Sequence, residues 1–186
     1  MATAPPRLVV QPSPATGRAV PRPVRHAREE DAPALYALSL LFMRSGALRE
    51  RPPALYAADA ADFLVLEAPD GTLEGCLGLR VHEADTDPRG GPGADAGAGA
   101  PGATGVLYNF CVSPRSQGRG VGGLLLGAAL TEATAHGLEA LFTATTGDGA
   151  LFLHHGFAVT GTDRAPDAWT RALDPRRGSR ILSRTL

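Results

Sequence analysis

The chain has 186 residues, of which 44% are hydrophobic, and a formal net charge of −1. This length suits one domain with a sizeable core, and the near-neutral charge gives no sign of a nucleic-acid or anionic-membrane partner. Cys76 and Cys111 fall in expected strands and fit neither a disulfide framework nor a metal site, which favours a reducing cytoplasm. No apolar stretch of the sequence approaches the length of a transmembrane helix, and no apolar core of a signal peptide follows Met1. We expect a cytoplasmic protein with no metal.

Two stretches have biased composition. Residues 1–22 are rich in Pro and Ala without periodicity, which predicts a disordered tail. Residues 84–104 consist mostly of Gly, Ala, Asp and Pro and cannot bury much apolar surface, so we expect a flexible loop inside the domain. The single folded domain should therefore span residues 23–186.

The first half of this domain predicts two helices and three strands. Apolar residues from Glu30 to Met43 recur at helical spacing, and Asp31 can cap the start. Pro69 to Thr72 form a turn between two apolar runs, which is typical of a β-hairpin. The expected strands are Val24–Ala27, Phe63–Ala68 and Leu73–Val81, and the expected second helix is Pro53–Ala61.

The second half alternates strands and helices. The strongest helix signal is Val121–His136, for which we expect Leu124, Leu125, Ala128 and Ala135 to form the buried stripe. Hairpin-paired strands followed by strand–helix–strand units predict a mixed α/β sheet. The remaining expected elements are the strands Val106–Val112, Leu141–Thr145, Phe157–Thr160 and Ile181–Leu186, and the short helix Ala150–His155.

The most informative motif lies between the strand that ends at Val112 and the helix that begins at Val121. Its sequence is Gln117-Gly118-Arg119-Gly120-Val121-Gly122. Glycines let the backbone approach a ligand closely, and the first N–H groups of a helix have no internal partner. The helix dipole also favours an anion at this end. The motif therefore predicts a phosphate-binding turn.

Three kinds of phosphate ligand can be compared. A P-loop is excluded because the chain contains no lysine to follow the glycines. A dinucleotide site is disfavoured: Gly118, Gly120 and Gly123 satisfy G-x-G-x-x-G, but Glu139 precedes its strand instead of following it. A coenzyme A pyrophosphate remains, and a likeness of sequence supports it.

Three motifs together resemble the acetyl-CoA site of the GNAT N-acetyltransferases. They are the strand that ends Val112-x-Pro114, the turn with Gln117, Gly120 and Gly122, and the later Ala150-Leu-Phe-x-x-x-Gly-Phe157. The resemblance implies a mixed, mostly antiparallel central sheet flanked by helices, with a splayed strand pair at the acyl-CoA site. It implies acetyl-CoA as co-substrate, held by the following residues: Phe110, Cys111, Val112, Gln117, Gly118, Arg119, Gly120, Val121, Gly122 and Phe152.

Further motifs resemble the acetyltransferase domain of N-acetylglutamate synthases of the short, stand-alone type. They are Val24-Arg-x-Ala, Gly46-x-Leu48, Asp62-Phe63, Gly75-Cys76 and Arg177-Gly-Ser179-Arg180-Ile-Leu. The resemblance implies acetylation of the amino group of glutamate, in arginine biosynthesis, and a possible homodimer. Because guanidinium groups bind carboxylates bidentately, arginines should hold this substrate. The candidate substrate-binding residues are Leu48, Arg49, Arg51, Arg177, Ser179 and Arg180.

Two departures from the subfamily leave other functions open. Glu50 stands where an arginine is usual and would repel a substrate carboxylate, and Gly178 replaces a second arginine. One alternative is therefore another small amine or amino acid, from secondary metabolism or resistance. The other is an acyl-CoA-binding module without catalysis.

Direct transfer from acetyl-CoA needs a base for the amine and an acid for the thiolate. Many family members use a tyrosine as the acid at the position that Phe152 occupies here. His154 or His155 could substitute, since histidine titrates in the right range. Asn109, on the strand beside the cofactor, is a candidate polar contact for the substrate or a water. Cys111 lacks an evident base and is not expected to be a nucleophile.

Overall fold

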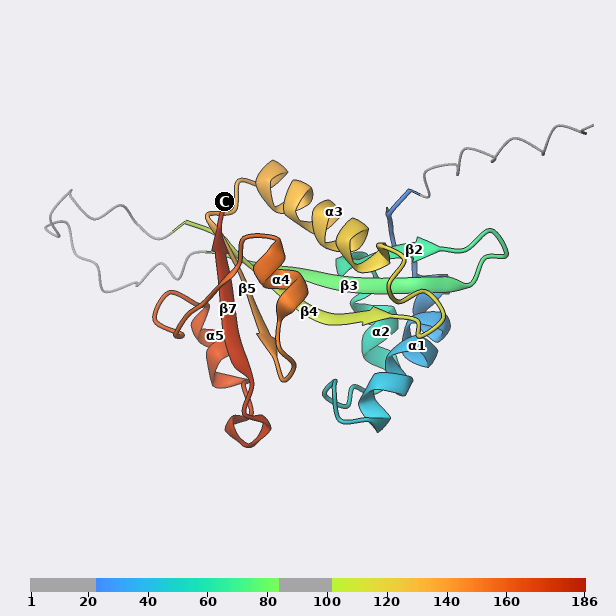
Figure 1. The fold of residues 1–186 in the computed structure, drawn as a ribbon, viewed down its shortest axis with the longest axis horizontal. Coiled ribbons are helices and arrows are strands. Elements are labelled where there is room, and N and C mark those ends of the chain that lie inside the picture. Colours follow the sequence, from blue (N-terminus) through green and yellow to red (C-terminus); the bar gives the residue numbers. More distant parts are fainter. Residues whose placement is uncertain (1–22, 84–101) are drawn as a thin grey trace, which may run out of the picture.

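The computed structural model describes residues 23–83 and 102–186 (Figure 1). The tail expected at residues 1–22 lies outside the described residues. The same is true of residues 84–101 in the expected flexible loop. The last residue assigned to that loop, Thr104, instead begins a strand.

A single seven-stranded sheet organises the described residues, in the order β1-β2-β3-β4-β5-β7-β6. Neighbouring strands are antiparallel except β4 and β5, which are parallel. This mixed, mostly antiparallel sheet confirms the expected fold class. The strands are β1 (Arg25–His26), β2 (Phe63–Glu67), β3 (Leu73–His82), β4 (Thr104–Val112), β5 (Ala140–Thr145), β6 (Ala158–Val159) and β7 (Arg180–Thr185).

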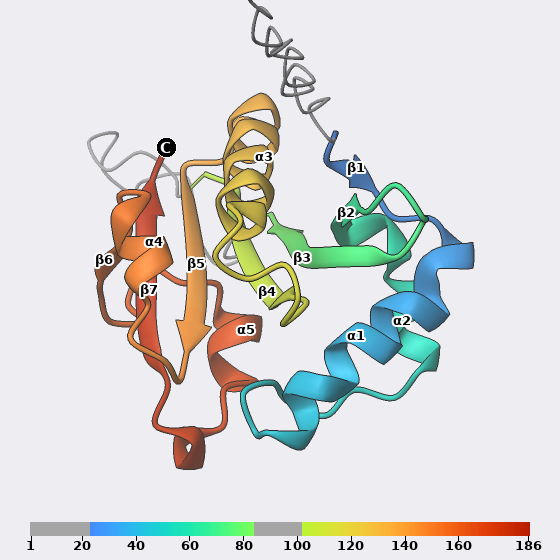
Figure 2. The same ribbon diagram turned by 45° about the vertical axis from the view of Figure 1, so that its right-hand side comes forward.

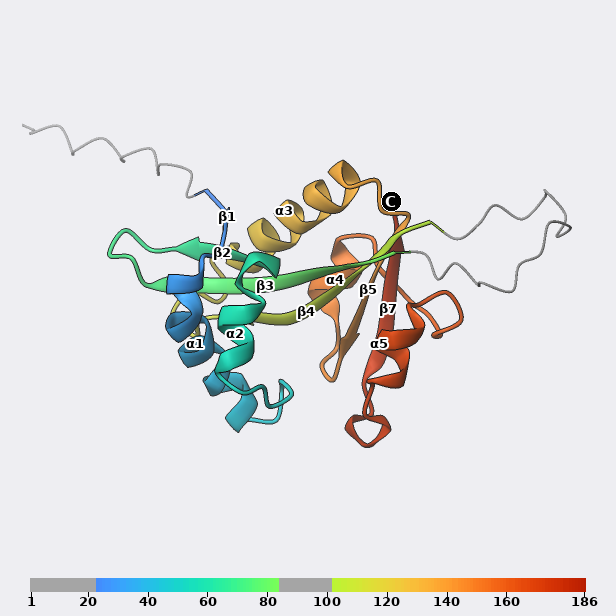
Figure 3. The same cartoon turned by 180° about the vertical axis from the view of Figure 1, so that it is seen from behind.

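Helices cover both faces of the sheet. α3 and α4 lie on one face, while α1, α2 and α5 lie on the other, which Figure 3 brings to the front. Among the described residues, no helix is long and apolar enough to cross a membrane. The helices are α1 (Ala32–Arg44), α2 (Ala54–Ala58), α3 (Val121–Ala135), α4 (Ala150–His154) and α5 (Asp167–Arg171), with 3-10 turns η1 (Glu29–Asp31), η2 (Ala60–Asp62) and η3 (Pro175–Arg177).

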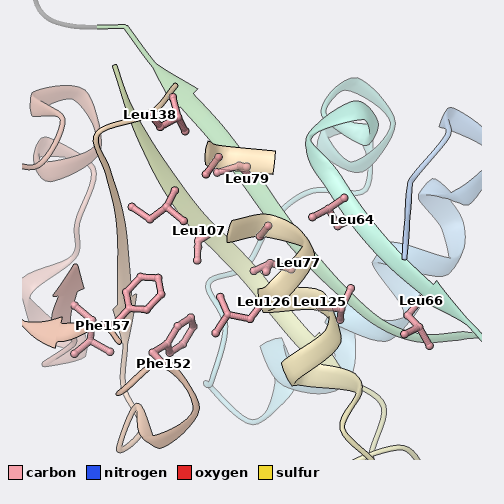
Figure 4. Close-up of a cluster of buried hydrophobic side chains, with 14 of the residues drawn as sticks. Leu64, Leu66, Leu77, Leu79, Leu107, Leu125, Leu126, Leu138, Phe152 and Phe157 are labelled. Atoms are coloured by element: carbon pink, nitrogen blue, oxygen red, sulfur yellow. The ribbon is translucent and has the colours of Figure 1, made fainter. Parts of the chain in front are cut away.

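The larger core cluster lies between α3 and the sheet (Figure 4). The buried stripe expected for this helix is largely wrong, because Leu124 is 53% exposed and Ala135 is also exposed. The first ten residues of α3 carry no polar side chain, so periodicity could not identify the buried face. Packing selects the other positions: Val121, Leu125, Leu126, Ala129 and Ala133 are buried.

The opposite face carries two smaller clusters. Leu35 and Leu38 of α1 pack with Tyr56 of α2 against β2, β3 and β4. Trp169 of α5 packs on Phe142 of β5, with ring centroids 6.3 Å apart. The sequence did not predict α5, because five residues are too few to display a helical apolar pattern.

β4 and β5 separate partway along their length. Their register pairs run from Thr104↔Ala140 to Leu107↔Thr143, although β4 continues to Val112. At the last pair, the buried Thr143 hydroxyl donates a hydrogen bond of 3.1 Å to the Leu107 carbonyl. Figure 2 shows the two strands diverging beyond this point. The separation gives β4 an edge without a β5 partner, as expected for a splayed pair.

A bulge in β4 follows the last paired residue. On the β3 side, Tyr108 pairs with Gly78 and Cys111 pairs with Cys76. Two residues of β4, Asn109 and Phe110, therefore face one residue of β3. Such a bulge bends the strand and increases its twist, which turns β4 away from β5.

Candidate active site

The glycine turn has the backbone of an anion-binding site. Gly118 and Gly120 have φ values of +72° and +81°, which residues with a Cβ rarely adopt. Leu124 makes an early helical hydrogen bond of α3, to the Gly120 carbonyl at 3.0 Å. The N–H groups before it, from residues 121–123, belong to the helix turn that has no intrahelical acceptor. A phosphate group fits this end of α3 by hydrogen bonding and by charge.

Buried contacts hold the start of this turn against the sheet. The Ser116 hydroxyl donates to the Glu74 carboxylate at 3.2 Å, and both side chains are buried. The Ser113 N–H donates to the Glu74 carbonyl at 2.8 Å. The amide of Gln117, itself exposed, donates to the Val112 carbonyl at 3.1 Å. The turn is therefore fixed to the ends of β3 and β4.

Apolar side chains line the space between β4 and α4. Phe110 and Phe152 meet edge to face, with ring centroids 5.6 Å apart. A Cβ built at Gly122 would lie 3.0 Å from Leu151 and 3.5 Å from the Phe110 ring. Gly122 therefore lets α3 pack closely on both groups, and the expected cofactor residues of the strand, turn and α4 adjoin one another.

A pocket of about 530 Å³ opens on the face of the sheet that carries α1, α2 and α5. Its walls come from the loop after α1, from β3 and β4, and from the segment that joins α5 to η3. Five of the six residues expected to bind substrate line it: Leu48, Arg49, Arg51, Arg177 and Ser179.

The sixth, Arg180, does not line this pocket in the described structure. It begins β7, where it pairs with Thr145 of β5, and its guanidinium donates to the Gly147 carbonyl at 2.9 Å. The strand begins one residue after Ser179, and this position directs Arg180 to the loop after β5.

Two of the pocket arginines connect its opposite walls. Arg49 donates to the Ala172 carbonyl at the end of α5, at 2.8 Å. In return, Arg177 of η3 donates to the carbonyls of Gly46 and Ala47 in the loop after α1, at 3.0 Å each. We call these reciprocal bonds the arginine clasp. The clasp holds the loop and the α5–η3 segment together across the pocket.

Arg51 stacks on the pocket face of Tyr108, with its Cζ 4.6 Å from the ring centroid. A cation over an aromatic face is attracted by the ring quadrupole. Its ion pair with Asp59 is 3.9 Å long, too long for a hydrogen bond. Arg51 is therefore a weakly paired guanidinium within the pocket.

Arg80, on β3, is paired much more closely. It bonds to Asp62 at 2.8 and 2.9 Å and forms a 2.8 Å ion pair with Asp59. The Tyr108 hydroxyl donates to the same Asp62 carboxylate at 3.0 Å. Burial, chiefly, raises the pKa of Tyr108 well above its usual value, so the phenol remains a protonated donor. Sequence reasoning did not identify Arg80, because its partners come from a separate element.

The three proposed catalytic side chains occupy different places. His154 and His155 lie at the end of α4, and the His155 ring is 3.8 Å from a Cβ built at Gly123 of α3. Neither histidine lines the pocket, because α4 packs on the opposite face of the sheet, with α3. Asn109 does line it, but its amide is hydrogen-bonded to Tyr56 and Ser39.

The two cysteines face each other across β3 and β4 and are buried free thiols. A hydrogen bond with Cys111 and burial raise the pKa of Cys76 well above its usual value. A protonated thiol is a poor nucleophile, which argues against covalent chemistry at Cys76.

Residues 32–157 match the model of the acetyltransferase (GNAT) family. Over 167 residues, the chain is 30% identical to amino-acid acetyltransferases of Neisseria meningitidis serogroups A and B, which covers 88% of this chain and 34% of theirs. The chain thus spans about a third of the length of these curated relatives.

The structure is similar to that of N-acetylglutamate synthase from Neisseria gonorrhoeae, solved with coenzyme A and N-acetyl-glutamate. The TM-score is 0.73 at 27% identity, over 91% of this chain and 36% of the other. A Mycobacterium tuberculosis protein solved with coenzyme A shares the fold, with a TM-score of 0.67 at 23% identity, over 88% of this chain and 98% of the other. With its glycine turn, split strands and mixed sheet, the chain belongs to the acetyltransferase (GNAT) family.

Proposed function

We propose that this protein transfers the acetyl group of acetyl-CoA to the amino group of a small, anionic amino acid. L-glutamate, in arginine biosynthesis, is the first candidate acceptor. The observation that carries the proposal is the pocket beside the strand split, which four arginines line: Arg49, Arg51, Arg80 and Arg177. Guanidinium groups bind carboxylates in a planar, bidentate way, so this lining favours an acceptor with carboxylates.

Acetyl-CoA enters this proposal as co-substrate on the other side of the split. The N–H groups of residues 117–122 hold the pyrophosphate, and the free edge of β4 at residues 110–112 holds the pantetheine arm. Two facts support this placement. The left-handed glycines leave the turn open, and Phe110 with Phe152 supplies an apolar wall beside the edge.

The reaction proceeds by direct transfer. The neutral amine attacks the thioester carbonyl, a C–N bond forms and the C–S bond breaks. A backbone N–H near Cys111 or Val112 stabilises the oxyanion. The amine gives up a proton, and the thiolate takes one. His154 and His155 lie on the cofactor face, where a histidine serves the leaving thiolate better than the amine.

One pocket residue favours a second candidate acceptor. Glu50 lines the same pocket between Arg49 and Arg51, and its carboxylate attracts a cation. A small cationic amine is therefore the alternative substrate class. A module that binds acyl-CoA without catalysis is a further alternative, because Phe152 stands where the family resemblance implies a tyrosine acid.

The test is thiol release from acetyl-CoA with a panel of acceptors, with the product identified by mass spectrometry. The panel contains L-glutamate, L-glutamine, L-aspartate and putrescine. We expect the highest kcat/KM with L-glutamate. Turnover with putrescine alone would support the cationic amine, and binding of coenzyme A without turnover on any acceptor would support the non-catalytic module. The family also suggests a homodimer, which light scattering tests.

A further inference from the structure

Asn109 has an unusual backbone at an important point of the sheet. It is the only non-glycine residue with positive φ in the described ranges, at +49°. Asparagine tolerates this left-handed region better than most residues with a Cβ. The residue lies in the β4 bulge, two residues beyond the last pair between β4 and β5.

The Asn109 side chain points toward α1 and α2, and the residue is 8% exposed. Its Nδ2 donates to the Ser39 hydroxyl of α1 at 2.8 Å, and its Oδ1 accepts from the Tyr56 hydroxyl of α2 at 3.2 Å. The Cys76 thiol of β3 donates to its backbone carbonyl at 3.6 Å. Both ends of the amide are therefore bonded to helices on the acceptor face.

These partners are buried themselves. Ser39 is 0% exposed and Tyr56 is 1% exposed, and burial chiefly raises the pKa of Tyr56, so its hydroxyl remains a donor. A buried polar group without its partner is unfavourable, so the three side chains hold one another in a single arrangement. That arrangement holds the bulge in place, because Asn109 cannot shift without breaking a buried hydrogen bond.

We propose that Asn109 is a positioning residue: its amide ties the β4 bulge to α1 and α2 and so sets the direction of the β4 edge at residues 110–112. This role differs from the substrate contact expected from the sequence. Asparagine meets both requirements of the site, since it tolerates positive φ and carries a donor and an acceptor. The inference rests on the proposed use of acetyl-CoA but holds for any acceptor.

The test measures the dissociation constant of coenzyme A by titration calorimetry for wild type, N109G, N109A, S39A and Y56F. Glycine still adopts the left-handed backbone but loses the amide hydrogen bonds to Ser39 and Tyr56. Alanine loses these bonds and also disfavours the left-handed backbone. We expect S39A and Y56F each to weaken binding about threefold, as the loss of one neutral hydrogen bond allows, and N109G about tenfold. N109A should bind coenzyme A more weakly than N109G. The control S45A removes the Ser45 bond to Phe42 at the end of α1 and should bind normally.

A double variant distinguishes a positioning role of Asn109 from direct contact with the ligand, because changes within one hydrogen-bond network are not additive in binding free energy. The double variant N109G/Y56F should bind coenzyme A no more weakly than N109G, because the tie is already lost. The KM for the acceptor should stay within about twofold in Y56F, as expected for a change confined to the cofactor edge. Melting temperatures by differential scanning fluorimetry identify any variant that fails to fold.

Two results would overturn the inference. Unchanged coenzyme A affinity in folded N109G, S39A and Y56F would show that the tie does not set the β4 edge. A raised acceptor KM in N109G alone, with S39A and Y56F normal, would show instead that the amide contacts the acceptor. If wild type itself does not bind coenzyme A, the proposed function fails, and this inference fails with it.

Discussion

Replacement of Arg51 by alanine should weaken acceptor binding more than any other single change in the pocket. The guanidinium is stacked on Tyr108 at 4.6 Å and is only weakly paired with Asp59, at 3.9 Å. A hydrogen bond to a charged group contributes about 1.5–3 kcal/mol. At roughly 1.4 kcal/mol per factor of ten, its loss should raise the KM for L-glutamate about 10- to 150-fold. The rate at saturating acceptor should change little, because the lost contact is present before and during transfer.

The assay is the initial rate of thiol release at saturating acetyl-CoA, with the acceptor varied. R51K keeps the charge but loses the planar fork and much of the stacking, so its KM should lie between those of wild type and R51A. Arg28 supplies the matched control, since its side chain is 70% exposed and lies near the start of the described chain. R28A should have wild-type kinetics.

Three measurements would refute this reasoning. An unchanged KM in R51A would show that Arg51 does not hold the acceptor. An equal rise in the dissociation constant of coenzyme A would show that the change reaches the cofactor side. A large fall in melting temperature in R51A would show that the stack on Tyr108 is mainly structural.

Three further changes should have separable effects. R177A removes the bonds to the carbonyls of residues 46 and 47. We expect a higher KM for the acceptor and an unchanged affinity for coenzyme A. A KM equal to that of wild type would contradict the role given to the arginine clasp. G120A forces a Cβ into a left-handed backbone at a cost of about 1–2 kcal/mol, so calorimetry should find weaker coenzyme A binding and denaturant unfolding a lower stability. The hydrogen bond from Arg25 lowers the pKa of Asp31 below its usual value, so this carboxylate stabilises the fold above its usual pKa and loses its contribution as pH falls through the lowered pKa. In D31N, the free energy of unfolding should fall less steeply as the pH is lowered. An unchanged dependence on pH would argue against the ion pair of Asp31 with Arg25.

The glycine turn and its flanking strand and helix were predictable because they are contiguous in sequence. Strand, turn and helix follow one another from residue 106 to residue 135, and the glycines need only their own backbone to form the turn. The fold class followed from hairpins and strand–helix–strand units in the same way. The orientation of α3 could not follow, since Leu124, Leu125 and Leu126 are equally apolar and only the contacts with the sheet distinguish them.

The pocket was harder to predict because distant segments build it. Arg80 of β3 meets Asp62 from before β2, and Trp169 comes from a helix too short to be expected. Motif spacing located Arg49 and Arg177 at the pocket, but not their bonds to opposite walls. A motif identifies the residue type, whereas the structure identifies which donors are already used.

Arg49 and Arg177 can form the arginine clasp and bind a carboxylate at the same time. A guanidinium has five N–H donors in a planar fork. The bond of Arg49 to Ala172 and the bonds of Arg177 to the loop after α1 occupy only one end of each fork. The wall contacts restrict the rotamers of both side chains, so less entropy is lost when the remaining donors meet a ligand. The connection between the pocket walls and the proposed recognition of an anionic acceptor therefore depend on the same two side chains, and loss of either arginine should impair both.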